Sequence, residues 1–165
     1  RHGSLTDEQI RWDRRFQIDT FLEDAIHFLL NFVASACALV DHSRTFYIYH
    51  YKRRQVLGHY PEATKARFAK DGLVQFVHKL RSLMLHVGLV GLDHETTYRD
   101  GDFVGRVVLH RDAALVWDGW ESVAKEWLKE GPPDIDLLET VKAYVAKVED
   151  FQAWYADERA KIVDS

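Results

Sequence analysis

Cysteine, proline and long hydrophobic runs are all scarce in this chain of 165 residues. Its single cysteine excludes an internal disulfide and a cysteine zinc cluster, as is usual for proteins of a reducing compartment. The longest apolar stretch, residues 27–40, contains Asn31 and Ser35 and is shorter than a bilayer-spanning helix. No signal-peptide pattern is recognisable at the start. The sequence therefore predicts a cytoplasmic protein with no membrane contact.

The charge lacks a strong bias of either sign. There are 22 basic and 26 acidic residues, so the chain has no overall positive charge of the kind that dominates nucleic-acid binding, which leaves a local basic patch as the route to RNA. Hydrophobic residues make up 47%, the composition of a folded globular protein. At about 100–200 residues per domain, residues 1–165 form one domain. Residues 1–4 look like a tag remnant or a trimmed start.

Helical periodicity dominates the first third of the chain. A capping box at Thr6 predicts a short helix to about Phe16. A second capping box at Thr20 predicts a long helix over residues 21–54, in which residues 41–43 are a candidate break. Pro61 fits the first position of the next helix.

The remainder of the chain alternates helical segments with one extended segment. Helices are expected over residues 73–87, 112–129 and 136–162, and Gly88 and the Gly-Pro-Pro run at 131–133 are stop signals. Asp100-Gly101 between extended segments predicts a β-hairpin. The predicted fold class is all-α: an antiparallel helical bundle of four to five main helices with a small β-hairpin insertion.

Most familiar catalytic motifs are missing. The chain contains no glycine-rich phosphate loop, no nucleophile elbow and no His-Glu-x-x-His or Glu-x-x-His motif. Glu23 and His27 share a helical face, but zinc needs three or four protein ligands. The sequence therefore predicts neither a metal nor a cofactor.

The helix predicted over residues 73–87 carries one polar face of interest. At about 100° per residue, its apolar side chains form a single stripe that must face the core. This stripe comprises Leu73, Phe76, Val77, Leu80, Leu83, Met84 and Val87. Arg81 and His86 lie on either side of it, and the face between them carries His78, Ser82 and Leu85.

An arginine and a histidine at this spacing suit one particular reaction. Cleavage of RNA by transesterification needs a group that moves a proton, and histidine does so near neutral pH. It also needs a fixed cation for the charge on the phosphoryl oxygens, which arginine supplies. A purely structural role in capping and pairing explains the same two residues, Arg81 and His86.

The same residues resemble a known motif. Arg81-Ser82-x-x-x-His86, late in an amphipathic helix and followed by Gly88, resembles the R-x4-6-H motif of the HEPN superfamily. The family pattern is often Leu-Arg-polar-apolar-apolar-apolar-His-x-Gly, which residues 80–88 follow closely. The residue after the arginine is commonly Asn, Asp or His, and here it is Ser82. The long helix before the motif and the hairpin after it are also similar to HEPN-like bacterial proteins of unassigned function.

The resemblance implies a fold, an activity and a mode of assembly. It implies a helical bundle that dimerises with its motif helices face to face. It also implies a metal-independent endoribonuclease, in many members a toxin or phage-defence effector, with Arg81 and His86 catalytic and Ser82 and His78 supporting them. An antitoxin or another protein partner is then expected. The family includes inactive members, so the alternative is a helical module that binds RNA, a nucleotide or a protein through the same surface.

Two further predictions concern binding and assembly. An aromatic and basic segment is a candidate RNA-binding surface, through Tyr47, Tyr51, Lys52, Arg53 and Arg54. On an ideal helix, Arg81 and His86 are about 140° apart and about 7.5 Å apart along the axis, so they do not converge on one atom. A two-fold axis beside the helix would bring two copies of each together. We therefore expect a homodimer in which Leu85 is buried by its symmetry mate.

Overall fold

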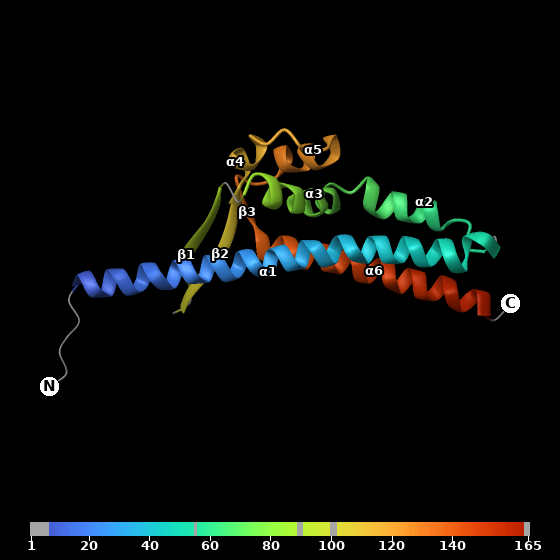
Figure 1. The fold of residues 1–165 in the computed structure, drawn as a ribbon, viewed down its shortest axis with the longest axis horizontal. Coiled ribbons are helices and arrows are strands. Elements are labelled where there is room, and N and C mark those ends of the chain that lie inside the picture. The colour runs from blue at the N-terminus through green and yellow to red at the C-terminus, as the bar shows by residue number, and fades with distance from the viewer. Residues whose placement is uncertain (1–6, 55, 89–90, 100–101, 164–165) are drawn as a thin grey trace.

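The fold is described from a computed structural model that places residues 7–54, 56–88, 91–99 and 102–163. It is mostly helical and carries a small three-stranded antiparallel sheet (Figure 1). The helical prediction with a β insertion is confirmed at this level. Residues 1–4, predicted to be a tag remnant or a trimmed start, and the predicted turn residues Asp100 and Gly101 lie outside the described residues.

The first helix is the longest element of the molecule. Helix α1 (Asp7–His50) runs without interruption for 44 residues. The prediction of two helices that meet near Thr20 is therefore wrong, and no break occurs at residues 41–43. No glycine or proline lies within α1, and polar residues such as Thr20 and Asp41 lower helix propensity too little to end a helix that packing holds. Figure 1 shows α1 spanning nearly the full length of the fold.

The chain reverses after α1 and then forms the central helix. A 3-10 turn, η1 (Lys52–Arg54), is followed by α2 (Tyr60–Thr64), a π-helical turn η2 (Lys65–Ala69) and α3 (Gly72–His86). Pro61 is the second residue of α2, one position after the helix start that was predicted for it. Asp71 caps α3 because its carboxylate accepts a hydrogen bond of 3.1 Å from Val74 N. Gly88, at φ +85°, follows the end of α3 in the left-handed conformation that glycine favours.

The extended segment forms the predicted hairpin and one additional strand. Strand β1 (Leu92–Arg99) pairs with β2 (Asp102–His110), and β2 pairs with the short β3 (Asp134–Asp136), which the sequence did not predict. His110 joins the three strands because its Nδ1 is 2.7 Å from Asp134 Oδ1 and its Nε2 is 3.6 Å from Asp93 Oδ2. The hydrogen bond to Asp134 raises the pKa of His110.

The segment predicted as one helix over residues 112–129 is divided in two. Helix α4 (Arg111–Leu115) ends before a non-helical turn, and α5 (Ser122–Glu130) follows it. The turn lets Trp120 enter the core, where its indole N–H donates a 2.8 Å hydrogen bond to Ala114 O and its ring stacks on Phe76. The last helix, α6 (Leu137–Val163), begins where the sequence predicts, because Asp136 accepts hydrogen bonds from two backbone N–H groups of its first turn.

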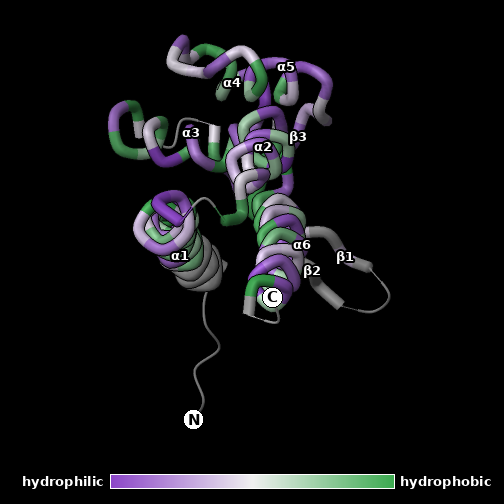
Figure 2. The backbone as a smooth tube through the Cα atoms, turned by 90° about the vertical axis from the view of Figure 1, so that its right-hand side faces the viewer, coloured by the Kyte–Doolittle hydropathy of each residue, from purple (hydrophilic) through white to green (hydrophobic). Residues whose placement is uncertain are grey.

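The hydrophobic core is organised around α3. Figure 2 shows α1 and α6 next to each other on one side of α3, and α5 lies on the other side. The main cluster includes Leu29, Val33, Leu73, Phe76, Val77, Leu80, Leu83, Leu109, Leu128 and Tyr144. A second, aromatic cluster joins the far ends of α1, α2 and α6 through Tyr47, Leu57, Tyr60, Phe151 and Tyr155.

Part of α1 has the length and composition of a membrane-spanning helix. The segment, Thr20–Arg54, includes α1 from Thr20 onward together with the η1 turn. Of its most apolar window, 17% is buried. The prediction from residues 27–40 was too restrictive, because a longer window remains apolar overall in spite of polar residues such as Asn31. Within this segment, Leu29, Val33 and Ala36 are buried in the main cluster.

The contact between α3 and α5 yields a first prediction. A Cβ atom at Gly72 would lie 2.5 Å from Trp127 Cβ, which is attached directly to the backbone of α5. We expect Gly72→Ala to lower the free energy of unfolding by about 1–3 kcal/mol, the usual cost of overpacking. Urea denaturation measures this loss. Gly58→Ala is the matched control, because nothing lies within 4 Å of a Cβ there. Equal losses of unfolding free energy in the two variants would contradict the prediction, because α3 and α5 would then move apart to accommodate the added methyl group.

Candidate functional site

The exposed side chains of α3 gather near its C-terminal end. Arg81, Leu85 and His86 are exposed, whereas Leu83 and Met84 between them are buried. We call Arg81, Ser82, Leu85 and His86 the α3 strip. Leu85 is 57% exposed, which is unusual for a leucine on a helix whose other apolar residues are almost all buried. The sequence prediction placed Val87 in the core stripe, but it is 44% exposed because it follows the last covered turn.

Arg81 and His86 occupy opposite edges of the α3 strip. Burial raises the pKa of the Cys37 thiol on α1, and the positive charge of Arg81 partly opposes this, so Arg81 lies on the α1 side. His86 lies in the last turn of α3, where the helix dipole favours a cation. Neither side chain forms a hydrogen bond or an ion pair with another described residue. Both are therefore free to meet a ligand.

His78 does not join this pair. It was predicted to support Arg81 and His86 because it shares their face of the helix. In the structure α6 covers that face one turn earlier, and His78 Nε2 is 3.1 Å from Tyr144 Oη. Burial lowers the pKa of His78. Ser82, the other supporting residue, is half-buried within the α3 strip.

The aromatic and basic segment is divided between core and surface. Tyr47 is buried and stacks on Tyr60 with ring centroids 4.3 Å apart, so its ring is already packed. Tyr51 is half-buried, and its hydroxyl accepts a 3.0 Å hydrogen bond from Arg159. The basic residues of η1 are all exposed: Lys52, Arg53 and Arg54. The exposed rings of the segment are those of Phe46, Tyr49 and His50, which belong to it but were not among the predicted RNA-binding residues.

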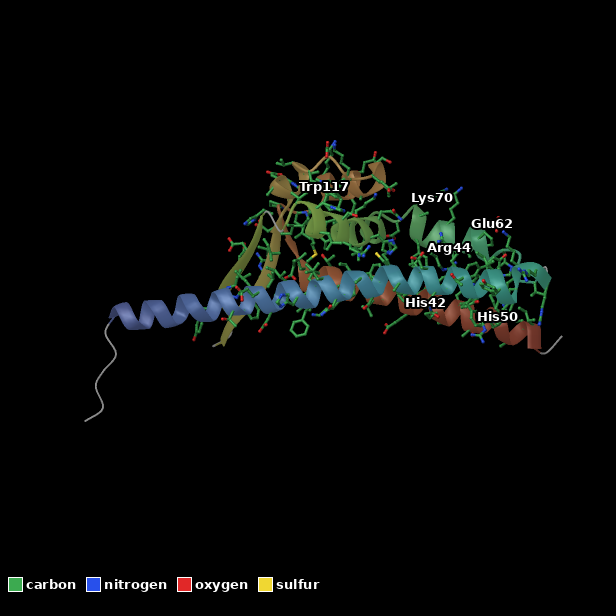
Figure 3. The ribbon with its side chains drawn as sticks, viewed as in Figure 1. His42, Arg44, His50, Glu62, Lys70 and Trp117 are labelled. Atoms are coloured by element: carbon green, nitrogen blue, oxygen red, sulfur yellow. The ribbon has the colours of Figure 1, made fainter. Side chains whose placement is uncertain are left out.

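A cavity of about 450 Å³ lies between α1, α2, η2, α3 and α6. Its lining includes Val40, Arg44, Ile48, Lys52, Lys65, Phe68, Gln75, His78, Val148 and Phe151. Figure 3 shows Arg44 on the side of α1 that faces α2, whereas His42 is on the opposite side. These residues come from four separate stretches of the chain, so no local sequence pattern identifies the cavity.

No family model, curated protein or solved structure matches the chain. The functional interpretation therefore depends on the geometry of the α3 strip and of the cavity. Among the residues that the structure describes, no group of three or more His, Cys, Asp or Glu side chains could hold a metal ion.

The environment of His78 yields a second prediction. Since its pKa is lowered in the folded protein, the unfolded chain binds a proton more readily below about pH 6.5. The contribution of His78 to stability is therefore complete above that pH and is lost as the pH falls. NMR titration of the ring protons should place the midpoint of His78 below 6.5. His78→Gln should remove this part of the acid destabilisation, whereas His42→Gln, on the exposed side of α1, should leave it unchanged. A midpoint at or above 6.5 would contradict the assignment.

Proposed function

We propose that the protein is a metal-independent endoribonuclease of the HEPN type, a cytoplasmic helical bundle that acts as a homodimer. The observation that carries the proposal is the pair of exposed, unpaired side chains, Arg81 and His86, on either side of exposed Leu85. Every other part of α3 is covered to a greater extent. As in toxin and defence members of this superfamily, a cognate antitoxin or other protein partner would control such an activity.

The proposed dimer explains why the α3 strip combines a leucine with two charged or titratable groups. A two-fold axis next to Leu85 would bury two leucines against each other. It would also place Arg81 and His86 of one copy beside those of the second copy. One phosphate could then contact groups from both chains, although the two residues of a single helix do not converge.

The proposed reaction requires only proton transfer and charge stabilisation. One His86 takes the proton from the ribose 2′-hydroxyl, and O2′ forms a bond to phosphorus as the P–O5′ bond breaks. The second His86 gives a proton to the departing O5′. Arg81 stabilises the negative charge on the phosphoryl oxygens. The products are a 2′,3′-cyclic phosphate and a 5′-hydroxyl, and DNA is not a substrate because it lacks the attacking group.

Cleavage of single-stranded RNA tests the activity. We expect the purified protein to cut mixed RNAs in the presence of EDTA and to leave DNA intact. His86→Ala should lower the rate by about 10²–10⁴-fold, the usual contribution of a general acid or base. Arg81→Ala should lower it by about 10²–10³-fold. His27→Ala, an exposed histidine on α1, is the matched control and should retain full activity. Equal RNA loss with wild type and His86→Ala would identify a contaminant and end the catalytic proposal.

The oligomeric state tests the composite site. Light scattering on a sizing column should give the mass of a dimer at tens of micromolar protein. Leu85→Glu should dissociate it, because two carboxylates would face each other in an apolar contact. Leu138→Glu is the matched control, since Leu138 on α6 is 59% exposed, nearly the same as Leu85. A monomeric wild type, or a Leu85→Glu variant that remains a dimer, would exclude a site shared between two α3 helices.

A further inference from the structure

The α3 strip contributes no residue to the cavity between α1, α2, η2, α3 and α6. The cavity is therefore a separate candidate binding site. We propose that it binds a small amphiphilic anion, an apolar chain or ring that carries one carboxylate or phosphate group. Its volume of about 450 Å³ is in the range of sites that enclose small organic molecules. This proposal does not depend on ribonuclease activity.

The walls of the cavity are suited to an apolar body. Leu39, Val40 and Ile48 line it from α1, Phe68 lines it from η2, and Val148 and Phe151 line it from α6. Water in contact with this much apolar surface is unfavourable, so an apolar ligand gains free energy by displacing it.

The charged side chains in the lining of the cavity are all positive, although the Asp41 carboxylate lies nearby and acts on His78. Arg44, Lys52 and Lys65 contribute to the lining, and none of its described residues is acidic. Acidic residues outnumber basic ones in the whole chain, so composition does not account for this bias. Arg44 pairs with Asp41 at 3.2 Å, but both side chains are 70% exposed, and such surface pairs contribute little. Arg44 is therefore available to an anion at the mouth.

Three of the polar side chains in the lining are already bonded within the protein. Thr64 Oγ1 donates to Tyr60 O at 2.9 Å, and Gln75 Nε2 donates to Phe68 O at 3.0 Å. His78 is bonded to Tyr144, and its lowered pKa keeps it neutral at neutral pH. The apolar walls and the lining cations together favour an amphiphile whose one polar group meets Arg44, Lys52 or Lys65.

Calorimetric titration with three ligands of the same chain length tests the charge preference. Laurate and dodecyltrimethylammonium are used below the concentration at which they form micelles, and dodecanol is used below its solubility limit. Dodecyl phosphate is a fourth ligand, used below its micelle concentration to compare the two anionic groups. We expect saturable binding of at least one anion, at least tenfold weaker binding of the alcohol and no binding of the cation. Equal affinities for laurate, dodecyl phosphate and dodecanol, or no saturable binding of either anion, would overturn the proposal.

Substitutions locate the binding site. Arg44→Ala combined with Lys65→Ala should weaken binding of the anion at least tenfold, whereas Lys129→Ala on α5 should not change it. Val148→Trp should fill the cavity and abolish binding. Ala69→Trp is a second filling variant at an exposed position of the lining, for use where Val148→Trp does not fold. Binding that survives in a folded filling variant would place the ligand elsewhere. RNA cleavage should be unchanged in both filling variants, so failure here is distinct from failure of the ribonuclease proposal.

Discussion

The burial of α3 is the constraint on which the rest of the structure depends. Its apolar side chains are covered from one side by α1 and α6 and from the other by α5. Each fully buried side chain such as Phe76 or Leu80 contributes about 1.5–3 kcal/mol relative to exposure. The start of the helix is fixed by Asp71, which caps α3 and also pairs with Lys147 of α6 at 2.6 Å. Because both sides and the N-terminal end of α3 are in contact with other elements, the exposed side chains of α3 lie in its last two turns.

The sequence predicted the elements whose signals are local. The apolar stripe of α3 as far as Met84, the pairing of the hairpin strands and the cap at Asp136 depend on residues a few positions apart, and these predictions agree with the structure. The break after Leu115 was missed because it depends on Trp120 reaching Phe76, more than 40 positions earlier in the chain. Strand β3 was missed for a similar reason, since three residues acquire their structure only by pairing with β2.

The candidate site shows the same division between local and long-range information. The helical wheel correctly gave the exposure of Arg81, Leu85 and His86, because α3 is regular. It gave no information on what covers each turn, so His78 was assigned to the same open face although Tyr144 covers it. The sequence did not predict the cavity, because its basic lining residues lie on separate elements: Arg44 on α1, Lys52 on η1 and Lys65 on η2. Gln75 and His78 line the cavity and precede Arg81 on α3, so one helix contributes residues to both the cavity and the α3 strip.

The π-helical turn Lys65–Ala69 follows α2 directly and sets how the side chains at its end are aimed relative to those of α2. A π turn contains about one residue more than an α turn, and one residue corresponds to about 100° of rotation along a helix. The loss of one residue from this turn would therefore rotate Phe68 relative to Tyr60, although both residues line the cavity. The wider turn thus lets two aromatic side chains eight positions apart reach the same cavity.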